Sequence, residues 1–501
     1  MTLAPRPPEI PAPMPSSTEA PVLVWFREDL RLGDHPALAA ALETGRPVTA
    51  LYLYDDASPS LRPLGGASQW WLSRSLKALA QDCAALGLPF TVRKGAAATE
   101  IPKAVKEAGA AQTLWSRRYG AAEAKIDGEV QARLERAGVE VSTFNGRLLY
   151  EPWEVTSKAG TPLKLFSPFW RACQAKGDPA PPLPRPTKRD VTAGPALDGL
   201  AVEDLALEPT TPDWAGGLRA NWTPGEAGAR EAVGAFLDDG LRGYAKNRDR
   251  PDLPATSRMS PHLRFGEVSP RQLWHAVEAA KAEGAANGTD VEKFRAELGW
   301  REFSYHLLHQ HPELATRNVQ PRFDAFPWSK PDPAQMRAWR RGLTGYPIVD
   351  AGMRQLWTTG WMHNRVRMIC ASFLIKDLLV DWREGEAWFW DTLVDADPAN
   401  NAASWQWVAG CGADAAPYFR VFNPILQGEK FDPEGAYVKA FVPELKDVPT
   451  RYVHKPWEAT EIELRAAGVT LGEDYPRTIV DHGKARDRAL AAFGRLPPKD
   501  G

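Results

Sequence analysis

An amide and two guanidinium groups lie close together in TGWMHNRVRMICASF, residues 359–373, among residues typical of a protein core. Wound as one helix at 100° per residue, this stretch has an apolar face about 60° wide. The face consists of Met362, Val366, Ile369 and Phe373. The opposite side carries Asn364 and Arg367 beside the small residues Gly360 and Ala371. Polar groups beside small residues leave room for a bulky ligand, and a solvated helix face is the alternative that this stretch leaves open.

Three hydroxyl side chains occur within TSRMSPHLRF, residues 256–265. Thr256, Ser257 and Ser260 stand next to Arg258 and before a predicted helix start. Hydroxyls and backbone N–H groups at such a turn suit a phosphate group. A capping box would explain the same residues, so both interpretations stay open here.

A carboxylate, an indole and a guanidinium share one predicted helix in FRAELGWREFSYHLL, residues 294–308. Glu297 and Arg301 stand at i and i+4, and Trp300 stands at i+3 from Glu297. A surface ion pair is the simplest interpretation, but a Trp between aromatic neighbours is unusual on a solvated face. This helix is therefore a second candidate for the wall of a binding site.

Two carboxylates precede a pair of asparagines in LVDADPANNAASWQWVAG, residues 393–410. Asp395 and Asp397 would supply part of a metal shell, but no nearby His or third carboxylate completes it. Hydrogen bonds to a ribose or to a ring N–H are an equally good use for them. His309 and His311 in HLLHQH do not share a helix face, so we expect no metal site.

Composition excludes several classes of protein. Of 501 residues, 44% are hydrophobic and 25% charged, and the net charge of −2 supplies no basic field, so DNA binding needs a local patch. The four cysteines show no CxxC spacing, which argues against a zinc site and suits a reducing cytosol. Residues 1–20 are Pro-rich and predict a disordered tail, and no run reaches the ~18 apolar residues of a membrane span. We expect a cytoplasmic protein.

Apolar, β-rich runs alternate with helical stretches between residues 21 and 150. The runs are 22–26, 48–54, 90–94, 112–116 and 139–144, and the helical stretches include 68–87 and 121–138. This alternation predicts an α/β domain with a Rossmann-like parallel sheet, although no GxGxxG follows the first strand. Residues 151–225 are rich in Pro and predict an interdomain connector. Residues 226–495 predict a larger all-α domain.

Several long motifs resemble the photolyase/cryptochrome flavoproteins, in the same order and between about residues 21 and 490. They are VWFREDLRLGDHPAL (24–38), TSRMSPHLRFGEVSPRQ (256–272), WREF (300–303), TGYPIVDAGMRQLWTTGWMHNRVRM (344–368), DWREGE (381–386) and DADPANNAASWQW (395–407). The resemblance is stronger to the class III photolyases than to class I. It implies an α/β domain, a connector and a helical FAD domain, in agreement with the pattern above.

The resemblance implies that FAD lies inside the helical domain. Its binding residues would be Tyr244, Thr256, Ser257, Met259, Ser260, Phe294, Arg301, Arg367, Asp395, Asp397 and Asn401. Arg367 would pair with Asp395 beside the isoalloxazine ring. Asn401 stands where photolyases usually have Asn facing flavin N5. A neutral amide there favours the reduced, anionic flavin that repair needs, since a carboxylate would repel it.

The resemblance also implies a pocket for two fused pyrimidines extruded from UV-damaged DNA. Its residues would be Glu297, Trp300, Asn364, Met368 and Trp407, with the aromatics stacking the pyrimidines and the carboxyl group on a base edge. Enzymes for (6-4) photoproducts generally have a proton-donating His in place of Met368, whose thioether cannot donate. The substrate indicated is therefore the cyclobutane pyrimidine dimer. Arg248, Arg365 and Arg420 would contact phosphates.

Trp405, Trp382 and Trp328 match the family's electron-transfer chain from flavin to surface, and they would also serve as packing residues. An antenna pigment is expected as well. PLGGASQWWLSRSL (63–76) and WSRRYG (115–120) are similar to class III enzymes and plant cryptochromes, which implies 5,10-methenyltetrahydrofolate. Ala122–Glu123 replaces the Asn-Glu pair of some folate-binding class I enzymes, so that site is not implied, and a deazaflavin stays an alternative.

We therefore expect a photolyase for cyclobutane pyrimidine dimers, which acts as a monomer. It would pass an electron from excited, reduced FAD to the pyrimidine dimer. A cryptochrome-type blue-light photoreceptor is the main alternative, and a (6-4) photolyase is a weaker one. The retained pocket residues and a chain end soon after Phe493, without a long regulatory tail, favour repair.

Overall fold

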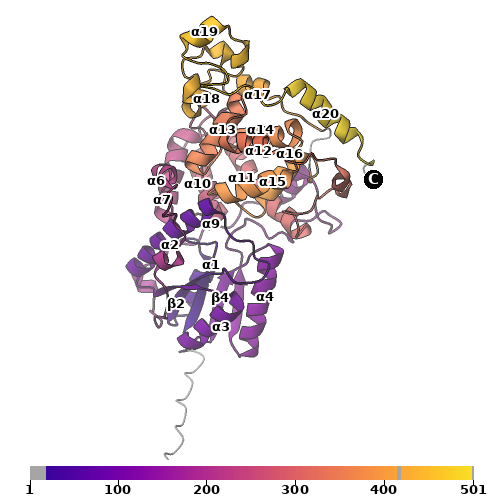
Figure 1. The fold of residues 1–501 in the computed structure, drawn as a ribbon. Coiled ribbons are helices and arrows are strands. Elements are labelled where there is room, and N and C mark those ends of the chain that lie inside the picture. Colours follow the sequence, from indigo (N-terminus) through magenta and orange to yellow (C-terminus); the bar gives the residue numbers. More distant parts are fainter. Residues whose placement is uncertain (1–18, 415–418, 499–501) are drawn as a thin grey trace, which may run out of the picture.

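The computed structural model describes residues 19–414 and 419–498, in which a sheet-containing domain precedes a larger helical domain (Figure 1). The predicted fold class is confirmed. Most of the predicted tail, 1–20, lies outside the described residues, although Ala20 is buried. Among the described residues, no helix has the length and apolar character needed to span a membrane.

The first domain is built on a five-stranded parallel sheet with the order β3-β2-β1-β4-β5. Its strands are β1 (Val22–Phe26), β2 (Val48–Tyr54), β3 (Phe90–Lys94), β4 (Gln112–Ser116) and β5 (Glu140–Phe144). Val22 on the central strand is the register partner of Val48 on one side and of Gln112 on the other. The five predicted strands are all present, and only β5 starts later than predicted.

Helices cover both faces of this sheet because the side chains of a strand alternate between its faces. α1 (Pro36–Glu43) and α2 (Gly66–Leu86) pack on the face that carries Val24 and Phe26. α3 (Ala97–Ala108) and α4 (Ala121–Arg136) pack on the opposite face, with Leu23 and Trp25.

The connector contains a helix that packs into the second domain. α5 (Phe166–Gln174) buries Phe169, Trp170 and Cys173 in a cluster that also holds residues of the helical domain. The Pro-rich stretches 179–188 and 206–214 contain no α-helix or strand, as predicted, and α6 (Gly216–Asn221) follows them.

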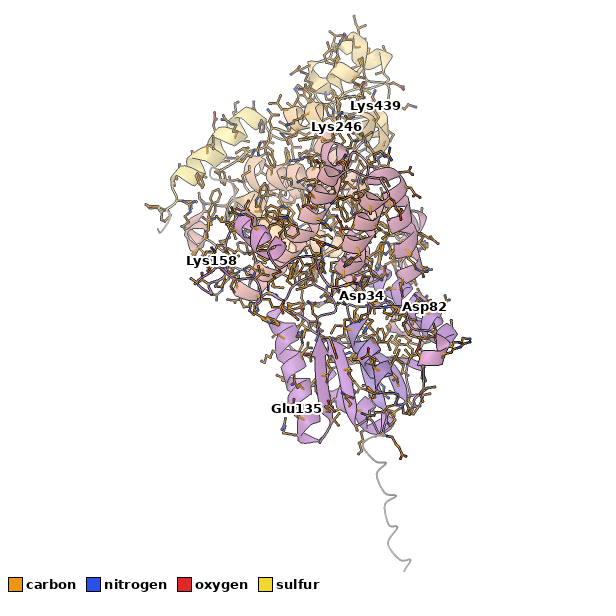
Figure 2. The ribbon with its side chains drawn as sticks, turned by 180° about the vertical axis from the view of Figure 1, so that it is seen from behind. Asp34, Asp82, Glu135, Lys158, Lys246 and Lys439 are labelled. Carbon is orange, nitrogen blue, oxygen red and sulfur yellow. The ribbon has the colours of Figure 1, made fainter. Side chains whose placement is uncertain are left out.

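Charged contacts join the two domains. Asp34, which lies at the junction in Figure 2, accepts hydrogen bonds from Arg271 at 2.7 and 3.2 Å. Arg62, in the loop before α2, forms a bidentate pair with Glu386 of the helical domain, both distances being 2.8 Å. The side chains of the first domain therefore reach into the second.

The second domain is helical and holds the largest apolar cluster, which includes the buried Trp339, Trp382 and Trp405. Its helices are α7 (Glu226–Ala235), α8 (Tyr244–Asn247), α9 (Ser260–Phe265), α10 (Pro270–Ala282), α11 (Gly288–Gln310), α12 (Pro333–Arg341), α13 (Pro347–Thr359), α14 (Asn364–Ser372), α15 (Trp382–Thr392), α16 (Asn400–Ala409), α17 (Pro424–Phe431), α18 (Ala436–Phe441), α19 (Glu461–Ala466) and α20 (His482–Gly494). A π-helical turn, η5 (Phe373–Asp377), extends α14.

The interpretation of residues 359–373 as one helix is wrong. α13 ends before Gly360, which adopts a left-handed φ of 66°, and α14 begins only at Asn364 with His363 as its N-cap. Gly360 lies against Val394 and does not join the polar stripe. The four residues of the predicted apolar face are nevertheless buried, because Met362 enters the core from the turn between the two helices.

Candidate flavin and nucleic-acid site

A cavity of about 550 Å³ lies inside the helical domain, within the size range of ligand pockets. Its lining contains most of the residues that the sequence singled out. They are Tyr244, Arg248, Thr256, Ser257, Met259, Ser260, Phe294, Glu297, Trp300, Arg301, Asn364, Arg365, Arg367, Met368, Asp395, Asp397, Asn401, Trp405 and Trp407. Trp328, Trp382 and Arg420 are the predicted site residues outside this lining. Segments far apart in the sequence thus form one site.

The hydroxyl groups of the 256–260 segment lie on one wall. Ser260 begins α9, and its Oγ accepts a hydrogen bond from the Trp361 indole at 3.2 Å. The N-cap of α9 is Met259, and no side chain caps the helix. The capping-box interpretation is therefore wrong. Ser257 Oγ accepts from the Met259 N–H at 3.4 Å, so the Ser257 and Ser260 hydroxyls each keep a hydrogen to donate to a ligand in the cavity. Arg258 adopts a φ of 52°, and its guanidinium covers the Trp222 ring at 4.1 Å.

An ion pair lies on the wall formed by α14 and the loop before α16. Arg367 donates two hydrogen bonds to Asp395, at 3.1 and 2.8 Å, and a third to the Met362 carbonyl at 2.7 Å. The Asp395 side chain is only 4% exposed, so removing its partner would leave a charge in a poorly solvated position. The break in the helix at Gly360 matters here, because it places the Met362 carbonyl within reach of Arg367.

Asp397 forms the most elaborate hydrogen-bond network of the cavity. It accepts from the Tyr305 hydroxyl at 2.6 Å and from the backbone N–H groups of residues 399 and 400 at 2.9 and 2.8 Å. Burial raises its pKa, but nearby guanidinium groups outweigh burial and hold the pKa below its usual range. These groups belong to Arg264, Arg301 and Arg147. Asp397 is therefore a fixed anion. Separately, the described residues include no cluster of His, Cys, Asp and Glu that could hold a metal ion.

The orientation of the Asn401 amide is set by its neighbours. Its Nδ2 group donates to the Glu386 carbonyl at 3.1 Å and to the Glu386 carboxylate at 2.8 Å. Since both partners only accept, the amide oxygen is left free to face the cavity. Arg62 of the first domain holds the same carboxylate and also lies 4.0 Å above the Trp390 ring.

Two of the arginines expected to meet DNA, Arg248 and Arg365, form ion pairs with carboxylates in this structure. Arg248 forms an ion pair with Glu297, which also lies 3.2 Å from the Lys293 ammonium. Arg365 pairs with Asp249 at 2.9 Å, and its guanidinium lies 3.8 Å from the Met368 sulfur. Phosphate and base contacts would therefore replace these internal pairs. Arg420 is exposed and lies just beyond residues 415–418, which are outside the described part of the chain.

His363 fixes the first turn of α14, which presents Asn364 and Arg365 to the cavity. Its Nδ1 accepts from the Arg365 backbone N–H at 3.2 Å. The side chain is buried, and its Nε2 has no hydrogen-bond partner among the described residues. Burial, rather than a charge partner, lowers the pKa of His363 to about 4, so this cap is neutral at physiological pH.

The three tryptophans of the expected electron-transfer chain differ in their surroundings. Trp405 lines the cavity. Trp382 is fully buried and donates its indole N–H to Asn318 at 2.9 Å. Trp328 is half-buried and lies beside Phe326 with ring centroids 4.3 Å apart. Their surroundings run from cavity to surface, and their role in electron transfer stays a prediction.

Sequence reasoning missed three contacts of the site. Glu386 and Arg62 orient Asn401, and Phe166 of the connector stacks on Trp300. The motif DWREGE, one of those that carry the family resemblance, contains Glu386. Nothing in the sequence linked Glu386 to Arg62, however. Phe166 lies within residues 151–225, which were predicted to be a connector because they are rich in Pro.

Comparisons with known proteins agree with this arrangement. Residues 22–187 match the family model described as DNA photolyase, and residues 294–495 match the FAD binding domain of DNA photolyase. The chain is 51% identical over 480 residues to a deoxyribodipyrimidine photo-lyase of Agrobacterium fabrum, covering 95% of this chain and 98% of that protein. It is 40% identical to cryptochrome-1 of Arabidopsis thaliana, covering 95% of this chain and 70% of that protein.

A crystal structure of a bacterial class III photolyase from Agrobacterium tumefaciens superimposes with a TM-score of 0.91 at 50% identity. The match covers 95% of this chain and 97% of that one. The fold and the site thus define a two-domain flavoprotein of the light-dependent type. The chain belongs to the photolyase/cryptochrome family, and the predicted resemblance is confirmed.

Proposed function

We propose that this chain is a light-driven DNA repair enzyme that splits cyclobutane pyrimidine dimers. One observation carries the proposal: a single cavity joins buried polar groups suited to FAD with four partly exposed side chains, those of Glu297, Trp300, Met368 and Trp407. The 51% identity to a protein named deoxyribodipyrimidine photo-lyase favours repair over signalling, since the cryptochrome match is weaker.

The cavity residues fit FAD in their chemistry. Hydroxyls at 256, 257 and 260 suit the phosphates, and ionised Asp397 suits a ribose hydroxyl or a ring N–H. The Arg367–Asp395 pair supplies fixed charges beside which a flat, polar ring system can lie. The amide oxygen of Asn401 is held ready to accept a hydrogen bond without adding negative charge.

Reduced FAD, when bound, supplies a light-excited electron donor. The protein's own residues would hold the flavin and the dimer in one cavity. Trp300 and Trp407 present aromatic surfaces to the pyrimidines, and Glu297 offers its carboxyl group once Arg248 turns to a phosphate. Met368 packs without donating a proton, which suits splitting of a cyclobutane ring and does not suit (6-4) chemistry.

We further propose that the protein acts as a monomer in the cytoplasm, on damaged DNA of the nucleoid, and carries 5,10-methenyltetrahydrofolate as antenna. The class III likeness supports the folate, with the motifs at 63–76 and 115–120. An absorption spectrum of the purified protein tests this assignment. A flavin spectrum with an added folate band is expected, whereas a deazaflavin band would refute the folate.

The substrate is tested with two oligonucleotides, one carrying a cyclobutane dimer and one a (6-4) photoproduct. Reduced protein under blue light is expected to repair the first and leave the second unchanged. Repair of the (6-4) lesion, or of neither lesion by protein with an intact flavin spectrum, would overturn the assignment.

A further inference from the structure

We propose that Phe166, in the connector, is a positioning residue for lesion binding that holds the indole of Trp300 in place from behind. The inference rests on the proposed function, in which the cavity-facing side of Trp300 stacks on the pyrimidine dimer. The connector would then be part of the substrate site and not only a link between domains.

The geometry is that of a face-to-face aromatic stack. The ring centroids of Phe166 and Trp300 lie 3.7 Å apart with an angle of 8° between the planes. The Trp170 ring lies nearly parallel to that of Phe166, at 7°, with 6.3 Å between the ring centroids. Trp300 lines the cavity, whereas Phe166 and Trp170 do not. The stack therefore lies behind the indole and leaves its other side to the cavity.

A glycine allows this close approach. A Cβ atom at Gly299 would lie 2.5 Å from the ring of Trp170, so any other residue there would push α5 away from α11. The start of α5 is held separately, since the Phe166 N–H donates to the Asp414 carboxylate at 3.3 Å. Burial of Phe169 fixes the next turn. Three independent contacts thus define where the Phe166 ring lies.

A backed indole has a physical advantage for binding an extruded dimer. A ring covered on one side has few orientations left, so little side-chain freedom is lost when pyrimidines stack on the other side. Undamaged DNA does not place bases in the cavity and gains nothing from this ordering. Loss of Phe166 is therefore expected to reduce affinity for the lesion selectively, and ordinary core packing would give no such selectivity.

The experiment measures the affinity of FAD-loaded protein for oligonucleotides with and without one cyclobutane dimer, in the dark. Phe166→Ala is expected to weaken binding of the damaged oligonucleotide about tenfold, which corresponds to the upper end of the stabilisation that an aromatic pair supplies. Binding of the undamaged oligonucleotide is expected to stay unchanged. Phe166→Tyr keeps the stack and is expected to stay within about twofold of wild type. Phe166→Leu fills the space without stacking and is expected to fall between them.

Cys173→Ala is the matched control, because it truncates a buried residue of α5 two turns beyond the half-buried Phe166. It is expected to alter thermal stability without altering the ratio of the two affinities. Phe166→Ala and Phe166→Leu proteins with wild-type ratios would overturn the inference, and so would equal losses for both oligonucleotides. If wild-type protein itself fails to discriminate, the proposed function fails, which separates the two outcomes.

Discussion

The two domains each gather buried charges, but they use them differently. In the α/β domain, Arg27 and Arg118 both pair with Asp127, at 2.5 and 2.7 Å, and His35 lies 3.1 Å from Asp29. These groups contact one another near the carboxyl ends of β1 and β4. In the helical domain the charged residues surround a cavity of about 550 Å³. Charged residues thus pair with one another in the first domain and line a cavity in the second.

The largest effect is expected from breaking an ion pair in each domain. Asp395→Asn leaves Arg367 without its partner, which is expected to abolish FAD retention and to lower the free energy of unfolding by about 3 kcal/mol. Asp127→Asn, the control in the α/β domain, is expected to cost similar stability but to keep FAD. FAD content and melting temperature report the two effects. Full FAD retention in Asp395→Asn protein would contradict the placement of this pair at the cofactor.

Acid is expected to weaken the helical domain through His363. Burial lowers its folded-state pKa to about 4, below the value of roughly 6.5 for unfolded chains. The unfolded state thus binds a proton first, so stability is complete above pH 6.5 and is lost as pH falls toward 4, by about 3 kcal/mol. His363→Asn keeps a capping side chain and is expected to flatten this dependence in melting curves. Parallel curves for the two proteins would contradict the account.

Salt is expected to weaken binding to damaged DNA through Arg248 and Arg365, which line the cavity, and through Arg420, which lies outside its lining. Three phosphate contacts, from Arg248, Arg365 and Arg420, predict a fall of about 40-fold between 50 and 200 mM salt. Arg365→Gln should reduce the slope of log affinity against log salt by about 0.9. Arg451→Gln removes an arginine that pairs with Glu463 and is not expected to contact phosphate, so it should leave the slope unchanged. A flat salt response would show that the three arginines do not meet phosphates.

A smaller effect is expected at Met368. A histidine there is polar and replaces the thioether beside Arg365, so dimer repair should fall about tenfold while FAD stays bound. Met368→Leu conserves volume and should repair at nearly the wild-type rate. Repair yield per absorbed light and the flavin spectrum are the two measurements. Unchanged repair by Met368→His protein would remove this residue from the substrate side of the cavity.

The sequence predicted the architecture well because periodicity reports burial. The apolar, β-rich runs identified the strands, and most site residues appeared in four segments that the fold brings together. Periodicity did not reveal the turn at Gly360. Met362 is buried in the turn, as it would also be in a continuous helix, so the apolar pattern is the same in both cases.

Long-range partners were beyond sequence reasoning. The stack of Phe166 on Trp300 joins positions 134 residues apart by number, and no local pattern records it. The same holds for Arg62 with Glu386, which meet only because the two domains dock. The pairing of Arg248 with Glu297 also differs from expectation, because a protein without DNA neutralises its own charges.

The central claim is that this cavity holds a photoactive flavin next to an extruded dimer. The most direct test follows base absorbance of a dimer-containing oligonucleotide during blue illumination of the reduced protein. Base absorbance is expected to rise only under light, to stop rising when the flavin is oxidised, and to stay constant in darkness. No rise from protein that retains a complete flavin spectrum would contradict the central claim.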